Sequence, residues 1–316
     1  MSASDGSNFS RRTLLKGSVL ATLGLTVGSR VLAADKPLPL ITKAIPSTKE
    51  KLPVIGVGTN AFGVSDPAEI ATRKEVLRRL TELGGSVVDT AQVYGTSESV
   101  IGGSLAELGI RSKIFIATKT PLGGDVSNAA DTIKKSFENL KTDKIDLLQI
   151  HNVHGVDELL PAMLDLKKAG RIRYVGITTS QTGQYAQLVE MMKKHPFDFV
   201  QVDYSIDNRE AEKEVFAVAK DKGMGVLVNS PLGGRRGNNL LAKVGSRELP
   251  KWAADIDVTS WAQFFLKYDV SHPVVTVAIP GSTKVSHLED NQRAARGRLP
   301  DAAMRKRMEE FWAGNA

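Results

Sequence analysis

The sequence predicts an α/β fold, a (β/α)8 barrel, and three observations lead to this prediction. Short β-branched or apolar runs recur eight times along the chain, with helical stretches between them. The runs are continuously apolar, which is typical of parallel strands that are buried on both faces. Eight strand–helix units within roughly 270 residues match this barrel in number and in size.

The eight predicted strands start where the regular pattern begins, shortly after Lys51. They cover residues 54–58, 86–90, 114–119, 147–152, 174–179, 199–205, 225–231 and 274–281.

Five stretches between the strands carry apolar residues at three- and four-residue spacing, as amphipathic helices do. They cover residues 66–85, 128–141, 156–170, 182–194 and 211–223. The first opens with Asp66 and Pro67, a helix start signal, and ends at Gly84 and Gly85. Several of the others also end in glycine, which is common at helix C-termini.

Two further segments complete the predicted barrel. Residues 35–50 precede the first strand and are expected to form a β-hairpin that closes the bottom of the barrel. Residues 233–257 form the longest irregular connection, and such a length suggests a functional loop. Residues 35–316 are therefore predicted to form a single barrel domain.

A doubly wound open sheet is the competing architecture. It would require a glycine-rich turn of the G-x-G-x-x-G type after the first strand. Gly56, Gly58 and Gly63 follow a different spacing, so the barrel is favoured.

Composition excludes several classes of function. The chain of 316 residues is 41% hydrophobic and 24% charged, which is ordinary for a globular protein. It has no cysteine, which excludes disulfides, thiolate catalysis and cysteine-bound zinc. The net charge of +7 is spread along the chain instead of forming a dense basic face with aromatic residues, so no nucleic-acid partner is expected.

The first 34 residues look like a twin-arginine (Tat) export signal. Arg11 and Arg12 precede a moderately apolar segment near residues 18–27, and small residues follow at Ala33 and Ala34. Such a signal is read by a receptor and normally removed, so it is set apart from the fold. It implies a bacterial periplasmic protein with the Tat machinery as a partner. The apolar segment is too short for stable membrane insertion, and a disordered tail or an uncleaved anchor is the alternative.

Polar residues collect at the carboxyl ends of the predicted strands, where the active site of such a barrel lies. Asp89 ends the second strand, Tyr94 follows it in the loop, Lys119 ends the third strand and His151 ends the fourth. Each has a structural alternative when taken singly, such as helix capping by Asp89. Together they are expected to converge on one mouth with polar residues from strands four to seven. These are Asn152, Thr178, Thr179, Ser180, Gln201, Asn229 and Ser230.

The set around Lys119 has a chemical meaning. A lysine drawn into a partly buried site requires a partner, and Asp89 on the adjacent strand can supply it. A phenol such as Tyr94 ordinarily titrates near pH 10, and a neighbouring ammonium favours its ionised form. A histidine can donate a hydrogen bond to a substrate oxygen. This set suits proton transfer at a carbonyl or alcohol oxygen, and a nicotinamide would have to supply the electrons.

At this point the sequence resembles the aldo-keto reductase family over roughly residues 40–295. The residues that carry the resemblance are VVDTAQVYGTSESVIG around Asp89 and Tyr94, FIATKT at Lys119 and DKIDLLQIHN at His151. The segments GRIRYVGITT, FVQVDYS and AIPGSTKVSHLEDNQ extend it. The combination of these motifs, each on the expected strand, is specific.

The resemblance implies a (β/α)8 barrel that binds NADPH, with NADH as an alternative, and reduces a small carbonyl substrate to an alcohol. Asp89, Tyr94, Lys119 and His151 match the catalytic tetrad of the family. By this analogy Tyr94 is the general acid, Lys119 paired with Asp89 tunes it, and His151 orients and polarises the carbonyl. A monomer is expected.

The resemblance also implies a set of cofactor-binding residues. Gln201, Thr179 and Thr178 match the positions that hold the nicotinamide carboxamide, and Asn229 stands where many members have a stacking aromatic residue. The other matching positions are Ser230 and Leu232 on the pyrophosphate path, Gly281, Ser282, Thr283 and Lys284 at the adenosine 2′-phosphate, and Asp290 and Asn291 at the adenine.

This chain departs from the family at several of these positions. Thr179 replaces an asparagine, Gly281 replaces a basic residue and His287 replaces an arginine. Lys284 is expected to compensate as the phosphate contact. The pair Arg235-Arg236 could also reach the phosphates, with ordinary surface solvation as the alternative.

Phe62, Val153, His154 and Trp252 are expected to line the substrate pocket, and the substrate to be an apolar aldehyde or ketone. A metal pair of His151 and His154 is rejected, because no further ligand is spaced to complete it. Two other functions stay open. One is a Schiff-base aldolase with Lys119 as the nucleophile, and the other is a non-catalytic NADP(H)-binding regulatory subunit.

Overall fold

A computed structural model describes residues 38–122, 126, 128–234 and 239–314. The predicted export signal, residues 1–34, and the pair Arg235-Arg236 lie outside the described residues. Among those described, no helix combines the length and apolar character that crossing a membrane requires.

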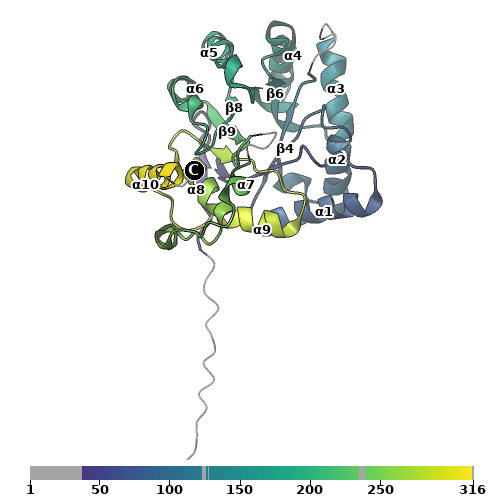
Figure 1. Cartoon of the computed structure of the whole chain (residues 1–316). Coiled ribbons are helices and arrows are strands. Elements are labelled where there is room, and N and C mark those ends of the chain that lie inside the picture. Colours follow the sequence, from purple (N-terminus) through teal and green to yellow (C-terminus); the bar gives the residue numbers. More distant parts are fainter. Residues whose placement is uncertain (1–37, 123–125, 127, 235–238, 315–316) are drawn as a thin grey trace, which may run out of the picture. The chain divides into compact units, whose positions relative to one another are not determined.

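Eight parallel strands in the described part of the chain form one sheet in the order β10-β9-β8-β7-β6-β5-β4-β3. Helices lie around the strands (Figure 1). The strands are β3 (Val57–Gly58), β4 (Val87–Asp89), β5 (Phe115–Lys119), β6 (Ile145–His151), β7 (Ile172–Thr178), β8 (Phe199–Asp203), β9 (Gly225–Asn229) and β10 (Val277–Ala278).

The first and last strands meet, which closes the sheet into a barrel. Bridges join Ile55 to Ala278 and Gly58 to Gly281, both in the parallel sense. Gly58 donates its backbone N–H to the Pro280 carbonyl at 3.0 Å. A Cβ at Gly58 would lie 2.8 Å from the Ile279 carbonyl oxygen, so this close approach requires glycine. The predicted (β/α)8 barrel is confirmed.

Each of the eight barrel strands is followed by a helix, and the five predicted helical stretches all contain one. The α-helices are α1 (Pro67–Glu82), α2 (Ser97–Leu108), α3 (Ala129–Asn139), α4 (Val156–Lys168), α5 (Tyr185–Lys194), α6 (Val215–Asp221), α7 (Leu240–Val244), α8 (Trp261–Ser271), α9 (Val285–Arg293) and α10 (Ala302–Gly314). Short 3-10 helices are η1 (Arg111–Lys113), η2 (Thr182–Gln184), η3 (Glu210–Glu212) and η4 (Lys251–Ile256).

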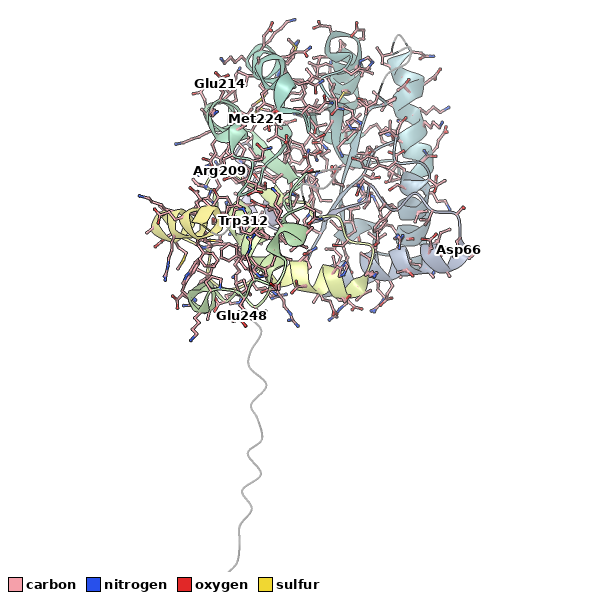
Figure 2. All side chains as sticks on the ribbon, viewed as in Figure 1. Asp66, Arg209, Glu214, Met224, Glu248 and Trp312 are labelled. Carbon is pink, nitrogen blue, oxygen red and sulfur yellow. The ribbon has the colours of Figure 1, made fainter. Side chains whose placement is uncertain are left out.

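Helix α1 shows how the local sequence sets these elements. Asp66 lies at the start of α1 (Figure 2) and its carboxylate accepts from the backbone N–H groups of Ala68 and Glu69 at 2.9 and 3.0 Å. Pro67 occupies the first helical position, where its missing N–H costs nothing. The helix buries one side against the barrel, with Val76, Leu77 and Leu80 in the core.

The barrel interior is closed at the amino ends of the strands by an antiparallel hairpin, β1 (Thr42–Ala44) and β2 (Lys51–Pro53). Ile45 and Leu52 belong to one buried apolar cluster with Val87, Phe115 and other side chains that strands contribute to the interior. The predicted hairpin therefore exists, but its second strand lies just beyond residues 35–50. The turn of the hairpin lies at residues 46–48, where the Ile45 N–H donates to the Glu50 carbonyl at 2.8 Å. The hairpin therefore lies a few residues later in the chain than predicted.

The long connection of residues 233–257 is more regular than predicted. It contains α7, with Asn239 capping the N–H of Leu241 at 2.8 Å, and the 3-10 helix η4. Both are short, so neither produces the extended periodicity that identifies a helix in a sequence.

Candidate active site

A cavity of about 330 Å³ opens at the carboxyl ends of the barrel strands. Residues from seven strands, β3 to β9, and from loops after the strands line it, as the convergence of strand ends predicted. The lining comprises Gly58, Thr59, Asn60, Asp89, Tyr94, Lys119, His151, Asn152, Thr178, Ser180, Gln201, Asn229, Ser230, Pro231, Leu232, Gly233, Gly234, Asn239, Ile279, Pro280 and Gly281.

Asp89 and Lys119 form an ion pair inside the barrel. Each is the last residue of its strand, β4 and β5, and these strands are neighbours. Lys119 Nζ donates to Asp89 Oδ1 at 2.5 Å and to the Thr90 carbonyl at 2.9 Å. Both side chains are almost completely buried. A buried pair of this kind is held only if hydrogen bonds satisfy both groups.

The second carboxylate oxygen of Asp89 is satisfied from the other side of the barrel. Gln201 Nε2 donates to Asp89 Oδ2 at 2.8 Å, and Gln149 Nε2 donates to the same oxygen at 3.3 Å. Thr178 in turn donates its hydroxyl to Gln201 Oε1 at 3.1 Å. The carboxylate is therefore held by side chains from three strands.

Lys119 also hydrogen-bonds the hydroxyl of Tyr94. Burial alone would lower the pKa of Lys119, but the charge of Asp89 and the contact with Tyr94 outweigh burial and raise it above its usual value of 10.5. Lys119 is therefore an ammonium at neutral pH. Its nitrogen lies 5.4 Å from the centre of the Tyr94 ring.

Tyr94 stands in the loop between β4 and α2, where it is half-buried at the cavity. Its backbone N–H bonds the Ala91 carbonyl at 3.0 Å, and its carbonyl accepts from Ser97 at 3.2 Å. The loop after β3 supports this turn closely, because a Cβ at Gly63 would lie 2.2 Å from the Tyr94 carbonyl oxygen. Tyr94 thus takes its place by backbone packing against a second loop.

His151 ends β6 and faces Tyr94. The two rings lie edge to face, with 6.4 Å between their centres. The His151 backbone N–H donates to the Thr120 hydroxyl at 3.1 Å. The next two residues, Asn152 and Val153, both have positive φ, at 51° and 59°. This conformation is costly for a β-branched residue, and such strain is typical of functional loops.

Residues 54–312 match the family model described as the aldo/keto reductase family. The chain belongs to the aldo/keto reductase family. Proteins of this family are oxidoreductases, and this chain carries at one cavity the four residues that its sequence motifs predicted for catalysis.

Individual relatives agree with this family. Methylglyoxal reductase YeaE of Escherichia coli (strain K12) is 29% identical over 260 residues, which cover 80% of this chain and 89% of that protein. Aldo-keto reductase yakc (NADP(+)) of Schizosaccharomyces pombe is 26% identical over 313 residues, covering 83% of this chain and 90% of that protein.

Solved structures of aldo-keto reductases have the same fold. The holo form of AKR11C1 from Bacillus halodurans matches with a TM-score of 0.70 at 23% identity, over 86% of this chain and 96% of that chain. An aldo/keto reductase from Klebsiella pneumoniae in complex with NADP and acetate matches with a TM-score of 0.68 at 21% identity, over the same shares of the two chains.

Half of the cofactor residues predicted for this aldo/keto reductase line the cavity: Thr178, Gln201, Asn229, Ser230, Leu232 and Gly281. Asn229 carries a buried Oδ1 that has no hydrogen-bond partner among the described residues. A buried acceptor without a partner suits a ligand that brings a donor. The cavity therefore fits a ligand with amide and hydroxyl groups, although the Gln201 amide is already bonded to Asp89 and Thr178.

The other six predicted cofactor residues do not line the cavity. Thr179 is buried and its hydroxyl donates to Gln184 Oε1 at 2.5 Å. Asn291 Nδ2 donates to Ser282 Oγ at 2.8 Å, and both are buried. Asp290 accepts from Ser260 at 2.7 Å and from Gln263 at 2.6 Å. The protein itself thus uses the polar atoms of these residues.

Thr283 and Lys284 lie just before α9. The Thr283 carbonyl accepts from Arg73 at 3.3 Å, while Lys284 is exposed. Lys284 is the N-cap of α9 and its side chain makes no cap bond, so among the described residues the cap leaves the first N–H groups of this helix available to an anion. Gly281, at the cavity, leads into this segment, which fits the phosphate end of a dinucleotide.

The four residues expected in the substrate pocket do not line the cavity. Phe62, in the loop after β3, is fully buried, and Val153 is also buried. His154 is half-buried outside the cavity lining. Trp252 packs against Phe264 and Phe311, with ring centres 5.8 and 5.7 Å apart. Phe62, Val153 and Trp252 therefore pack in or against the hydrophobic core, and the sequence alone does not reveal this.

Asn152 after β6 and Ser180 after β7, which were expected at the mouth, also line the cavity. Thr59 and Asn60 after β3 and Asn239 before α7 complete the polar lining and were not selected from the sequence. Thr59 and Asn60 follow the end of a predicted strand, so the same rule that selected Asp89 could have found them. Asn239 follows no strand directly and carries no such signal. Among the described residues no His, Cys, Asp and Glu cluster could hold a metal ion.

Proposed function

We propose that this aldo/keto reductase reduces a small aldehyde or ketone to the alcohol with NADPH, and that Tyr94 is the general acid. One observation carries the proposal. The Lys119 ammonium is hydrogen-bonded to both the Asp89 carboxylate and the Tyr94 hydroxyl, at the floor of an open cavity.

This geometry supports a role for each of these residues. When bound, NADPH supplies the hydride that reduces the carbonyl carbon. Tyr94 donates its proton to the carbonyl oxygen as negative charge develops there. Lys119 keeps its own proton, because its pKa is raised, and its positive charge stabilises the phenolate that Tyr94 becomes. His151, which faces Tyr94, would donate a hydrogen bond to the same oxygen.

The chain offers residues for each part of the cofactor. Gln201, Thr178 and Asn229 would hold the carboxamide end, and Ser230 and Leu232 would line the pyrophosphate path. The segment from Gly281 to Lys284 would hold the 2′-phosphate at the open start of α9. NADPH is favoured over NADH because Lys284 is exposed there and carries the positive charge that this phosphate needs.

The described cavity lining favours a small polar carbonyl compound over the apolar one expected from the sequence. Apart from the residues assigned to the cofactor, Asn60, Asn152 and Asn239 bring three amides to it, whereas Ile279 is its bulkier aliphatic residue. Amides select substrates that carry hydroxyl or second carbonyl groups, since each unpaired amide costs affinity. The named activity of the relative YeaE, methylglyoxal reduction, is of this kind.

Cofactor oxidation on a panel of carbonyl compounds tests the proposal. Methylglyoxal and a hydroxylated aldehyde are compared with an aliphatic aldehyde of equal length, each with NADPH and with NADH. The proposal expects turnover with NADPH, a lower KM for the polar compounds and a higher KM for NADH. Absence of turnover, together with no NADPH binding by fluorescence, would sink it.

The two alternatives have less support. A Schiff-base aldolase needs Lys119 as a free amine, whereas this lysine is buried, paired with Asp89 and has a raised pKa. A regulatory subunit without catalysis would have no need of Tyr94 at the cavity beside Lys119. Borohydride trapping of a carbonyl compound on Lys119 would support the aldolase, and NADPH binding without turnover would support the regulatory subunit.

We propose further that residues 1–34 direct the folded protein to the periplasm by the Tat pathway, and that it works there as a monomer. The sequence of the leader, with Arg11 and Arg12, carries this proposal. Cell fractionation of the full chain and of an Arg11→Lys, Arg12→Lys variant tests it. Mass spectrometry of the periplasmic protein would show whether a nucleotide is exported with it, and equal cytoplasmic retention of both chains would contradict the proposal.

A further inference from the structure

Gln149 lies beside the catalytic residues but outside the cavity lining. It is on β6, two residues before His151, so the two side chains leave the strand on the same face. In the sheet register it pairs with Lys119 on β5 and with Gly176 on β7. It is completely buried, and its Nε2 lies 3.3 Å from Asp89 Oδ2.

The Asp89 carboxylate determines which end of the Gln149 amide faces it. An ionised carboxylate only accepts hydrogen bonds, so the amide nitrogen has to face Asp89. Gln149 Oε1 is then left buried without a partner among the described residues. An unpaired buried acceptor is costly. The unpaired oxygen destabilises the folded state, but this orientation gives Asp89 a hydrogen-bond donor.

The neighbouring strand makes room for this side chain. A Cβ at Gly176 would lie 2.8 Å from Gln149 Cγ, closer than real Cβ atoms come to a neighbour. Any larger residue at position 176 would therefore displace Gln149 from Asp89. The aliphatic part of the Gln149 side chain occupies the space that a side chain at position 176 would fill.

The inference rests on the proposed function, since it concerns how Tyr94 is supported. An ammonium has three N–H donors. Those of Lys119 meet three acceptors: Asp89 Oδ1, the Thr90 carbonyl and the Tyr94 hydroxyl. The direction of the third donor depends on where the first acceptor stands. Whatever fixes the Asp89 carboxylate therefore fixes the bond from Lys119 to Tyr94.

We propose that Gln149 is a positioning residue for carbonyl reduction. With Gln201 it holds Asp89 Oδ2, which leaves Oδ1 directed at Lys119 and keeps the Lys119 ammonium aligned with Tyr94. Gln201 lines the cavity and would also meet the cofactor, whereas Gln149 acts through Asp89 alone. Replacing Gln149 should therefore slow the chemical step and leave the affinity for NADPH unchanged.

A double-mutant cycle between Gln149 and Asp89 tests the proposal. Gln149→Met keeps the length of the side chain and removes the donor. Asp89→Asn keeps the shape of its partner but removes the second accepting oxygen. In the native background, Gln149→Met is expected to lower kcat about tenfold, as for a lost hydrogen bond to a charged group. The Kd for NADPH should stay within twofold of the native value, by an order-of-magnitude criterion. In the Asp89→Asn background the same change should alter kcat less than about twofold.

Gln292→Met is the matched control. Gln292 is buried, donates one bond, to the Ile55 carbonyl at 3.1 Å, and likewise has an Oε1 without a partner among the described residues. Its replacement should lower the melting temperature as Gln149→Met does but leave kcat unchanged. The proposal would be overturned if Gln149→Met lowered kcat equally in both Asp89 backgrounds. It would also be overturned if Gln149→Met lowered the melting temperature but left kcat unchanged.

The melting temperatures of the four proteins of the cycle separate this proposal from the proposed function. If the native chain reduced no carbonyl compound, the proposed reaction would fail. Coupling of the two changes in melting temperature would still show that Gln149 holds Asp89. Additive melting temperatures would show that Gln149 does not hold this carboxylate, whatever reaction the cavity performs.

Discussion

Lys119 Nζ lies 2.5 Å from Asp89 Oδ1, and both side chains are buried at the ends of adjacent barrel strands. Lys119 Nζ lies 5.4 Å from the centre of the Tyr94 ring, so the charge that faces the tyrosine is itself held by a carboxylate. The remaining bonds of that carboxylate come from Gln149 and Gln201. The arrangement places one buried ammonium beside one half-buried phenol.

Removing one partner of this pair should be strongly destabilising. Asp89→Ala leaves the Lys119 ammonium buried without its counter-ion, and breaking such a pair typically costs about 3–5 kcal/mol of the free energy of unfolding. Denaturant unfolding measures it. The exposed pair of Lys74 and Glu107, at 2.8 Å, is the control, and Lys74→Met should cost less than about 1 kcal/mol. Similar costs for the two variants would show that burial does not distinguish these pairs.

Lys119 should stay protonated well into the alkaline range. Its pKa in the folded chain is raised above 10.5, so the ion pair contributes to stability below that pH and its contribution is lost only as the pH rises through the folded value. The 13Cε chemical shift of Lys119 should therefore not titrate below about pH 10.5, the reference range for lysine. Titration near pH 8 would contradict the raised pKa and would revive the aldolase alternative.

Gly63→Ala should impair catalysis without touching a reacting group. The new Cβ would lie 2.2 Å from the Tyr94 carbonyl oxygen, so the Tyr94 loop must move. A displacement of about 1 Å at a catalytic group can cost on the order of a hundredfold in rate, which steady-state kcat measures. Gly183→Ala is the control, because its Cβ would meet no atom within 4 Å. An unchanged kcat for Gly63→Ala would mean that the two loops move together.

Two adjacent glycines of α2 should respond in opposite directions. A Cβ at Gly102 would lie 2.4 Å from the Asn139 carbonyl oxygen of α3, whereas a Cβ at Gly103 would meet only Lys141 Nζ, at 3.9 Å. Gly103→Ala should raise stability by about 0.5–1 kcal/mol through helix propensity, and Gly102→Ala should lower it. Thermal unfolding of the two variants checks this. Stabilisation by both would show that α2 can move away from α3.

The sequence predicted which strand-end residues meet at the cavity, because position along a parallel strand decides this. Asp89, Lys119 and His151 each end an apolar run, and in a barrel all such ends meet. Gln149 was missed although it lies two residues before His151 on the same face. It stands within the run, where a polar residue breaks an apolar pattern without marking a strand end.

Apolar residues in loops were the least predictable. Phe62 lies in the loop after the first barrel strand and Trp252 lies in the long connection after β9, where pocket residues were expected. Phe62 is nevertheless fully buried, and Trp252 packs against α8 and α10. Whether a loop side chain turns toward the mouth or the core depends on contacts with distant segments. For Trp252 these are Phe264 and Phe311, and no local pattern identifies them. The shifted hairpin has a similar cause, since the contacts of Ile45 and Leu52 with the barrel interior set its place.

The central claim is that Tyr94 donates the proton in carbonyl reduction, and the most direct measurement compares native protein with Tyr94→Phe. Single-turnover oxidation of bound NADPH by methylglyoxal is followed in both. Loss of a general acid should slow this step by about a hundredfold or more, while the Kd for NADPH stays the same. Equal rates in the two proteins would contradict the role of Tyr94 and the mechanism built on it.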